Sequence, residues 1–421
     1  MAIDASEVMA TAPQGLPDPL SYGSAVVLDL LPDVLREVPP PGADLHGVAD
    51  ELLNITRLRQ LGVELTTTCN LACVYCHFAP LTRRGKDADQ GTVENLIDFV
   101  KQFPVDYVTL SGDAEITMYK GWDEVARRML AANIELRTIS NFSKGIFSEA
   151  EIDVFSQFRE ILISLDTCDA ALLKKIRYRA DLRTITTNMQ LVRTRAIQTG
   201  RRMPHFVCNV VTHDINIGLA DQTAAFALAC GFAQLNFVRF VELEEVSGGK
   251  NDLRDNPNAQ QVRRIRELDL PGAAKAVRAL QRAVEICKDK IALHIQPGIV
   301  DEINLIINPE TAGAPKASTL APGQIRTKQC LMPWDFFYVL WNGDVPPCCI
   351  VKDTMIGNVA TKPLIDVING DGIKEYRAGL LTGNLKPECQ TCTYVPDTDT
   401  QTLTAHVRNY LSAYGKGAVA A

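Results

Sequence analysis

Short β-rich runs alternate with helix-like stretches through the first 240 residues, and this alternation constrains the fold more than any other feature. The runs have the length of buried strands, and we expect strands at Val63–Thr66, Tyr107–Leu110, Leu136–Ile139, Ile161–Leu165, Phe206–Val211 and Leu235–Phe240. Strands that alternate with helices usually pair in parallel. We therefore predict an α/β fold with a partial (β/α)6 TIM-like barrel, whose chemistry lies on loops at the carboxyl ends of the strands.

Apolar residues at helical spacing lie between the strands and predict the covering helices. They form three sets: Val93, Leu96, Ile97 and Val100; Ile185, Met189 and Val192; and Val277, Leu280, Val284 and Cys287. A segment rich in Pro, Ala and Gly follows at Thr311–Gln324. Its composition predicts an exposed connection to the C-terminal part of the chain.

Composition and charge indicate which binding partners and which cellular compartment to expect. The formal net charge is -7, and Lys and Arg do not form blocks interleaved with aromatic residues, so we expect no nucleic-acid partner. No window approaches the roughly 20 apolar residues that cross a bilayer, and Met1–Gln14 does not read as a secretory signal. We therefore expect a cytoplasmic protein with no membrane partner. Its 12 cysteines are then free thiols available to metals rather than a disulfide framework.

Three cysteines follow the first predicted strand at close spacing. Three residues separate Cys69 from Cys73, and two separate Cys73 from Cys76. A loop with this spacing can bring three thiolates to three irons of a 4Fe-4S cluster, and it leaves the fourth iron without a protein ligand. A zinc site made by the same cysteines and completed by His77 is the alternative that the spacing leaves open.

This loop, with Tyr75 just before its last cysteine, resembles the radical S-adenosylmethionine (SAM) superfamily. The resemblance implies that the open iron binds SAM, that Tyr75 lies beside the cofactor, and that the reduced cluster cleaves SAM to methionine and a 5'-deoxyadenosyl radical. That radical abstracts a hydrogen atom from an unactivated carbon. A flavodoxin or ferredoxin-type protein would supply the electron.

The resemblance extends to the turn after the second predicted strand, Ser111–Ile116. Relatives have a Gly-Gly-Glu-Pro-like turn here, which implies that Glu115 accepts a hydrogen bond from the SAM ammonium. Gly112 would let the backbone approach the ligand. Ile116 replaces the usual proline and Asp113 offers a second carboxylate, so the SAM contact is either Asp113 or Glu115.

Other residues at strand ends resemble positions that face the cofactor or substrate in relatives. These are Asn141 after the third predicted strand and Ser164 and Asp166 at the end of the fourth. Arg177 matches an arginine that could pair with the SAM carboxylate as a bidentate clamp. Neighbouring lysines make a solvated helix face the alternative for Arg177.

The fifth predicted strand offers Asn209 as a contact near the SAM ribose, again by resemblance. Side chains alternate along a strand, so Cys208 packs against the helices if Asn209 faces the barrel interior. This placement counts against Cys208, which is the one candidate for a catalytic hydrogen donor.

Four more cysteines lie near the C-terminus, at positions Cys330, Cys348, Cys389 and Cys392. Four thiolates can ligate every iron of a 4Fe-4S cluster. Asn342-Gly343-Asp344 predicts the tight turn of a strand-turn-strand unit that presents Cys348. The spacing resembles the SPASM/twitch modules appended to radical SAM barrels, in the shorter form with a single auxiliary cluster. A zinc site made by the same four cysteines is the alternative.

These features together predict a partial (β/α)6 TIM-like radical SAM barrel followed by a small α+β SPASM/twitch module. We expect an extension of unknown role at 1–54 and the barrel at 55–245. A barrel completion or linker should follow at 246–327, the auxiliary-cluster module at 328–395 and a tail at 396–421.

The resemblance implies a radical SAM oxidoreductase that abstracts hydrogen from a peptide or small natural-product substrate. Its cofactors would be SAM and two 4Fe-4S clusters, one that binds SAM and one auxiliary cluster through which the substrate undergoes net oxidation. A radical SAM peptide epimerase or crosslinking enzyme is the alternative within the superfamily. A zinc-binding regulatory or scaffold protein is the alternative from another class.

Overall fold

The computed structural model describes residues 48–76, 85–240, 262–309, 320–321, 323–351, 353–392 and 394–415. His77, most of the segment 1–54 and most of the linker expected at Thr311–Gln324 lie outside the described residues. All of the other candidate site residues are described.

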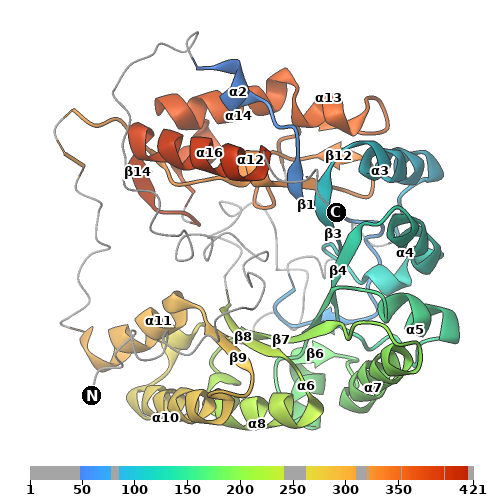
Figure 1. Cartoon of the computed structure of the whole chain (residues 1–421). Helices are drawn as coiled ribbons and strands as arrows, with labels where there is room; N and C mark the ends of the chain where they lie inside the picture. Colours follow the sequence, from blue (N-terminus) through green and yellow to red (C-terminus); the bar gives the residue numbers. More distant parts are fainter. Residues whose placement is uncertain are drawn as a thin grey trace.

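An eight-stranded parallel sheet forms the centre of the fold. In spatial order its strands are β11 (Phe336–Val339), β1 (Leu58–Val63), β3 (Val105–Leu110), β4 (Glu135–Ser140), β5 (Glu160–Ser164), β7 (His205–Thr212), β8 (Gln234–Arg239) and β9 (Ala292–Ile295). Figure 1 shows the strands along an open arc with helices on its outer side. Among the described strands β11 and β9 end the order and do not pair with each other, so the barrel is partial, as predicted.

The first strand begins and ends earlier than predicted. The sequence predicts a strand at Val63–Thr66, whereas β1 ends at Val63. The next residues pair with the segment that leads into the first long helix, where Ala88 N donates to Leu65 O at 2.8 Å. This pairing turns the chain away from the sheet, so the cysteine loop starts at the carboxyl end of β1.

The two faces of the sheet differ in polarity. Leu61, Val108 and Leu136 occupy matching register positions on the outer face and are fully buried under the helices. The inner, concave face carries polar side chains at matching positions, among them Gln60, Tyr107, Arg137, Glu160, His205 and Asn209. Burial of the outer face supplies the hydrophobic stabilisation, whereas the inner face can contact a polar ligand.

Helices cover the outer face between successive strands. They are α3 (Gln90–Gln102), α4 (Trp122–Ala131), α5 (Glu149–Phe155), α6 (Ala170–Ile176), α7 (Leu182–Gln198), α8 (Ala220–Cys230), α10 (Leu270–Cys287) and α11 (Pro297–Ile307). The helix α3 begins where Asp89 Oδ1 accepts a hydrogen bond from Thr92 N at 2.7 Å. The predicted apolar faces of α3 and α7 are confirmed, because all seven of their residues are buried: Val93, Leu96, Ile97, Val100, Ile185, Met189 and Val192.

The buried face of α10 differs from the predicted one. Leu280 and Cys287 are buried as expected, but Val277 and Val284 are only partly buried. The rest of the buried face consists of alanines, namely Ala273, Ala276, Ala279 and Ala283. Small side chains let α10 approach its neighbours closely, so the pattern of large apolar residues alone misplaces the face.

The C-terminal stretch adds small elements and one strand of the barrel sheet. Besides β11 it holds β10 (Arg326–Lys328), α12 (Met332–Asp335), β12 (Asp344–Val345), β13 (Gly357–Asn358), α13 (Leu364–Ile368), α14 (Asp371–Thr382), α15 (Pro387–Gln390), β14 (Asp397–Asp399) and α16 (Thr400–Gly415). The turn predicted at Asn342–Asp344 is present, with Gly343 at φ 81°. However, β11 pairs with β1 and β12 pairs with β13, so the predicted strand-turn-strand unit bridges the barrel and the module.

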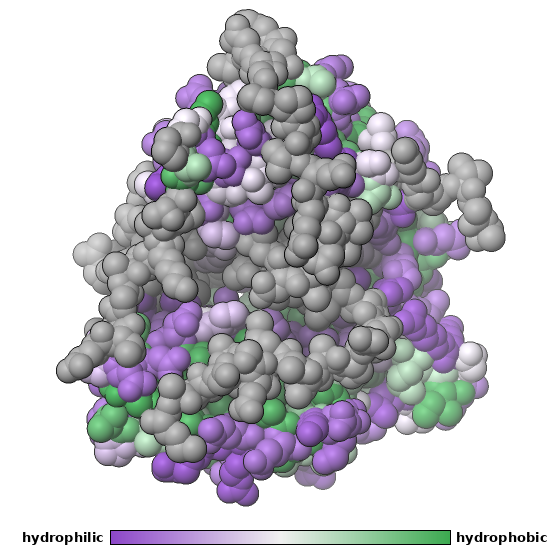
Figure 2. Space-filling view, turned by 60° about the vertical axis from the view of Figure 1, so that its left-hand side comes forward, coloured by the Kyte–Doolittle hydropathy of each residue, from purple (hydrophilic) through white to green (hydrophobic). Residues whose placement is uncertain are grey.

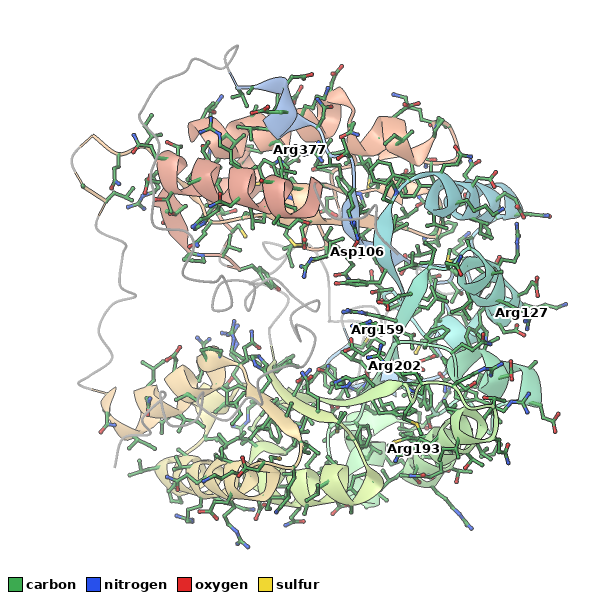
Figure 3. The ribbon with its side chains drawn as sticks, viewed as in Figure 1. Asp106, Arg127, Arg159, Arg193, Arg202 and Arg377 are labelled. Carbon is green, nitrogen blue, oxygen red and sulfur yellow. The ribbon has the colours of Figure 1, made fainter. Side chains whose placement is uncertain are left out.

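Arg377 fastens these C-terminal helices to the start of the barrel, where α2 (Asp50–Leu53) precedes β1. Its fully buried guanidinium donates to Pro333 O at 2.7 and 3.0 Å and to Leu53 O at 2.6 Å. Trp334 Nε1 adds a hydrogen bond to Leu52 O at 2.7 Å. Figure 3 shows Arg377 among these helices. Buried carbonyl groups need donors, so these contacts fix how the C-terminal stretch docks.

On the face shown in Figure 2, most of the described surface is hydrophilic, with apolar residues scattered among the polar ones. Exposed large apolar side chains include Ile146, Ile197 and Leu270. Within the described part of the chain, no helix is both long enough and apolar enough to cross a bilayer.

Candidate functional site

The cysteine loop leaves the carboxyl end of β1 and is tied to the ends of other strands. Three hydrogen bonds hold it: Glu115 N to Thr68 O at 3.2 Å, Asn70 Nδ2 to Ser143 O at 3.1 Å and Val74 N to Ile176 O at 2.9 Å. A further contact is a two-residue antiparallel ladder between β2 (Ala72–Cys73) and β6 (Arg177–Tyr178). Protein contacts therefore fix the loop on both of its sides.

Cys69, Cys73 and Cys76 lie close enough to influence one another. Burial raises the pKa of the Cys73 thiol to about 12, and the charges of Cys76 and Cys69 also raise it, whereas the charge of Arg177 lowers it. Cys73 is buried, while Cys69 and Cys76 are partly exposed. In the described ranges no three His, Cys, Asp or Glu side chains converge tightly enough to hold one metal ion. In a 4Fe-4S cubane each thiolate would bind a different iron.

Arg177 forms an ion pair with Asp166 rather than a solvated helix face. Its Nε donates to Asp166 Oδ2 at 2.9 Å and its Nη2 to Asp166 Oδ1 at 3.0 Å. Both side chains are buried, and Arg177 Nη1 also lies 3.9 Å from Cys73 Sγ as a hydrogen-bond donor. The two residues that were expected to face the ligand therefore contact each other and the cysteine loop.

The same Asp166 carboxylate binds two more donors. Tyr75 OH donates to Oδ2 at 2.7 Å, and Val211 N donates to Oδ1 at 3.0 Å. The ring of His213 lies next to Tyr75, with ring centroids 6.1 Å apart. His213 is completely buried, burial lowers its pKa to about 4, and among the described residues neither ring nitrogen has a hydrogen-bond partner.

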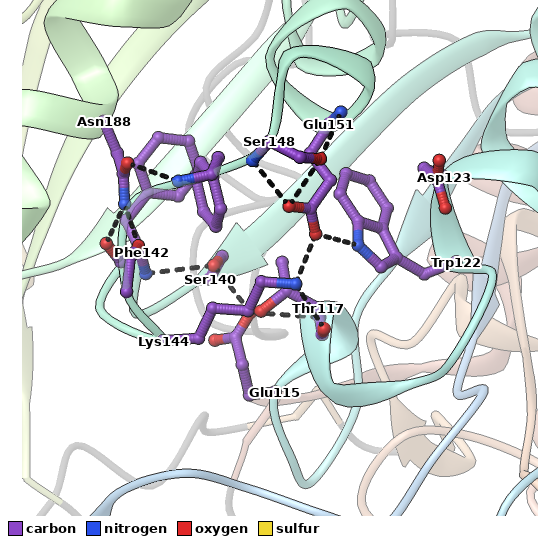
Figure 4. A network of polar contacts seen from close by, with 12 residues as sticks. Glu115, Thr117, Trp122, Asp123, Ser140, Phe142, Lys144, Ser148, Glu151 and Asn188 are labelled. Atoms are coloured by element: carbon purple, nitrogen blue, oxygen red, sulfur yellow. Dashed lines mark hydrogen bonds and ion pairs between the residues drawn. The ribbon is translucent and has the colours of Figure 1, made fainter.

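Glu115 is the hub of a buried network at the ends of β3 and β4. Its carboxylate accepts hydrogen bonds from Thr117 N at 3.3 Å, Thr117 Oγ1 at 2.9 Å, Ser140 Oγ at 2.7 Å and Asn141 N at 2.7 Å. Figure 4 shows how Lys144 continues the network, because its ammonium contacts Thr117 O and the Glu151 carboxylate. Burial raises the pKa of Glu115, while its hydrogen bonds lower it.

Asn141 links this network to the cysteine loop. Its Nδ2 donates to Asn70 Oδ1 at 2.9 Å, and its Oδ1 accepts from Ser143 N at 2.8 Å. Asn70 follows Cys69 directly in the sequence. An unbroken chain of hydrogen bonds therefore runs from Glu115 through Asn141 to the loop that carries the three cysteines.

Gly112 lies against Glu64, the residue that follows β1. A Cβ at Gly112 would come within 2.6 Å of Glu64 Cγ, so only glycine fits without a shift. Glu64 is buried, and its Oε1 accepts a hydrogen bond from Asp113 N at 3.0 Å. Gly112 thus allows the close approach of Glu64, and its expected approach to the ligand stays a prediction.

The register of the sheet places the remaining candidates. Ser164 pairs with Asn209 on the concave face, where Asn209 also pairs with Asn236. Cys208 pairs with Ile163 and Leu235 on the opposite face and is fully buried in the apolar core. Cys208 therefore points toward the helices, and its thiol faces away from the side that carries Asn209.

The four C-terminal cysteines also form one group. Burial raises the pKa of the Cys330 thiol well above its ordinary value, and the charges of Cys348, Cys389 and Cys392 raise it further. Burial likewise raises the pKa of Cys389 to about 12. Val351 N donates to Cys348 Sγ at 3.4 Å, an amide contact of the kind that stabilises a thiolate.

Two family models match the chain in these two regions. The model described as the radical SAM superfamily matches residues 63–207, and the SPASM model, described as an iron-sulfur cluster-binding domain, matches residues 330–393. The chain carries a radical SAM domain and a SPASM domain. The radical SAM domain implies a 4Fe-4S cluster and SAM as cofactors, and the SPASM domain implies auxiliary iron-sulfur binding.

Solved structures share the fold. The crystal structure of Streptococcus suis SuiB bound to precursor peptide SuiA aligns with a TM-score of 0.53 and 14% identity over 77% of this chain and 67% of that chain. Native anSMEcpe with bound AdoMet and the Kp18Cys peptide aligns with a TM-score of 0.51 and 13% identity over 84% of this chain and 99% of that chain. No curated protein sequence matches significantly.

Two buried residues near these groups, Glu64 and Asn216, were missed by sequence reasoning. Glu64 is a buried acid that directly follows β1, and this position at a strand end was the only sequence feature that could have pointed to it. Asn216 is buried too; its Nδ2 donates to Asp166 O at 3.1 Å and to Val211 O at 2.8 Å. Asn216 therefore fixes the segment after β7 against the ion-pair residue.

Proposed function

We propose that this chain is a radical SAM oxidoreductase that acts on a peptide or a small natural product in the cytoplasm. The observation that carries the proposal is the loop with Cys69, Cys73 and Cys76, which lies at the carboxyl end of β1 inside the radical SAM domain. In parallel α/β barrels this is the end where chemistry occurs.

Cys69, Cys73 and Cys76 would hold the first 4Fe-4S cluster. Three thiols on one fixed loop fit three irons and leave one iron for SAM. When bound there, the cluster and SAM supply a 5'-deoxyadenosyl radical that takes a hydrogen atom from the substrate. The contribution of the protein is to keep the loop, the turn after β3 and the concave face in one arrangement.

The SAM ammonium would meet the turn Ser111–Ile116. Glu115 already accepts four protein hydrogen bonds, which supports it as the residue that fixes this turn. Asp113 is the second carboxylate of the turn, and a comparison of Glu115→Gln with Asp113→Asn decides which of the two contacts SAM. Ser164 and Asn209 share the concave face and are proposed to contact the rest of the cofactor.

Cys330, Cys348, Cys389 and Cys392 would hold one auxiliary 4Fe-4S cluster. A cluster with four protein ligands has no open iron for the substrate, so its suitable role is electron transfer. We propose that the substrate radical loses its second electron to this cluster together with a proton to solvent, which gives net two-electron oxidation. A flavodoxin or ferredoxin-type donor would supply electrons from outside.

A peptide is the preferred substrate class. SuiB, which shares the fold, is described in complex with a precursor peptide, and the concave face of this chain carries the partly exposed polar side chains Ser164 and Asn209, which can bind a peptide backbone. The unidentified partner would then be a peptide whose side chain or α-carbon lies next to SAM.

The oxidation is tested by replacing Cys330, Cys348, Cys389 and Cys392 together with alanine. We expect this variant to keep its N-terminal cluster and to form 5'-deoxyadenosine, but to give no oxidised product. Cys349→Ala is the matched control, because it removes a neighbouring thiol outside the proposed set. Normal product from the quadruple variant would overturn the electron-acceptor role and favour a redox-neutral epimerase with a purely structural auxiliary site.

A further inference from the structure

The side chain of Arg177 reaches from one edge of the cysteine loop to the end of β5. Cys73 and Arg177 are direct partners in the antiparallel pairing of β2 with β6. Arg177 Nη1 lies 3.9 Å from Cys73 Sγ as a hydrogen-bond donor, and only 7% of the Arg177 residue is exposed. A full positive charge is therefore buried beside one of the three thiols.

Asp166 fixes the direction of this charge. The Asp166 carboxylate accepts Nε and Nη2 of Arg177 at 2.9 and 3.0 Å, and it also accepts Tyr75 OH and Val211 N. A bidentate pair holds a planar guanidinium in one orientation. With these two nitrogens bound to Asp166, the remaining Nη1 faces the sulfur.

Apolar surroundings strengthen the electrostatic effect of the Arg177 charge on Cys73. Val74, Ile176, Phe240 and Val262 form a small buried apolar cluster around this part of the loop, with Tyr75 packed against it. Electrostatic interactions are stronger in such a water-poor environment than at a surface. The positive end of the pair is nearer to Cys73, since the carboxylate lies on the far side of the guanidinium.

We infer that Arg177 is a positioning residue that sets the reduction potential of the SAM-binding cluster through its hydrogen bond to Cys73, with Asp166 as its anchor. The inference rests on the proposed function in one respect, namely that Cys73 is a cluster ligand. Potentials of iron-sulfur clusters depend on hydrogen bonds to their sulfurs and on nearby charge. A buried cation stabilises the added electron, so Arg177 raises the potential and Asp166 partly offsets this effect.

The test is an anaerobic redox titration of the full-length reconstituted protein, followed by EPR. The SAM-binding cluster is identified by the change of its signal when SAM is added, and the auxiliary cluster serves as the internal reference. We expect Arg177→Gln to lower the potential of the SAM-binding cluster. Asp166→Asn keeps the cation and removes its counter-charge, so we expect the opposite shift.

Two further variants control the experiment. Arg128→Gln removes a partly exposed arginine that pairs with Glu94 on helix α3, and it should shift neither cluster. Arg177→Lys keeps the charge but cannot bridge Asp166 and Cys73 as a fork, so its downward shift should be smaller than that of Arg177→Gln. It also provides a measurable variant if Arg177→Gln does not retain the cluster.

The outcomes separate the inference from the proposed function. Opposite shifts in the Arg177→Gln and Asp166→Asn proteins, with an unchanged auxiliary cluster, support the inference. Shifts of the same sign, or no shift in a protein that keeps both clusters, overturn it and leave the proposed function intact. A wild-type protein without any SAM-responsive cluster would instead contradict the proposed function itself.

Discussion

The carboxylate of Glu115 accepts a 2.7 Å hydrogen bond from the backbone amide of Asn141, which joins the end of β3 to the end of β4. The Asn141 side chain continues this link to Asn70 in the cysteine loop. Adjacent strand ends and the loop are thus held by side chains that relatives suggested as direct cofactor contacts. Their first effect is to fix the geometry around the three cysteines.

This network predicts that Glu115→Gln destabilises the protein. The Gln amide nitrogen cannot accept the hydrogen bonds that one carboxylate oxygen accepts now, so a buried donor loses its partner at a cost of about 1–3 kcal/mol. Chemical denaturation of the wild type and the variant measures this difference. Asp113→Asn, in the same turn, is the control and should change stability by less than about 0.5 kcal/mol. Equal stability of the Glu115→Gln protein and the wild type would show that the hydrogen bonds to Glu115 do not stabilise the folded protein.

Gly112→Ala should disturb the turn after β3. The added Cβ would lie 2.6 Å from Glu64 Cγ, and the shift needed to relieve this contact costs roughly 1–3 kcal/mol. Gly91→Ala is the matched control, because Gly91 lies exposed in the first turn of α3, where alanine favours the helix. Thermal unfolding of both variants should show a loss for Gly112→Ala alone. A Gly112→Ala protein as stable as the control would contradict the tight contact with Glu64.

Buried His213 predicts a loss of stability in mild acid. Its pKa is about 4 in the folded protein, whereas an unfolded histidine titrates near pH 6.5, so the unfolded state binds more protons between these values. The His213 contribution is therefore fully present above about pH 6.5 and falls by up to about 3 kcal/mol as the pH drops toward 4. Urea unfolding at several pH values should show a weaker dependence in His213→Gln. An identical pH dependence in both proteins would contradict the neutral buried state.

Because Arg377 binds both Leu53 O and Pro333 O, we expect the C-terminal stretch and the barrel to unfold together. Arg377→Met would leave the carbonyl oxygens of Pro333 and Leu53 without their donors, which should cost about 3 kcal/mol or more. The exposed Arg282→Met is the matched control and should cost little. Calorimetry should show one transition in the wild type and a lower or split transition in Arg377→Met. An unchanged single transition would mean that Arg377 does not couple the two parts.

The strand pattern and the cysteine groups could be predicted from the sequence because both are local signals. Five of the six predicted strands lie within one or two residues of β3, β4, β5, β7 and β8. The partner of β1 could not be predicted in the same way. Phe336–Val339 follows β1 by more than 270 residues, and tertiary contacts hold this strand at the barrel edge. They include the hydrogen bonds from Arg377 to Pro333 O and from Arg59 to Asp335.

The sequence indicated candidate residues for the site but not how these residues contact one another. Resemblance selected Asp166 and Arg177 separately as groups near the ligand, and nothing in the sequence shows that they form a bidentate pair across helix α6. Alternation along a strand did place Cys208 and Asn209 on opposite faces, since that inference needs only local geometry. Contacts between loops need the tertiary fold, which one sequence does not reveal.

The central claim is that Cys69, Cys73 and Cys76 hold a cluster that cleaves SAM. The most direct measurement is 5'-deoxyadenosine formation after anaerobic reconstitution and reduction with dithionite, with iron counted in parallel. We expect brown wild-type protein that forms 5'-deoxyadenosine, and a Cys69→Ala, Cys73→Ala, Cys76→Ala variant that lacks roughly four irons and forms none. A colourless wild-type protein with stoichiometric zinc, or continued SAM cleavage by the triple variant, would contradict the claim.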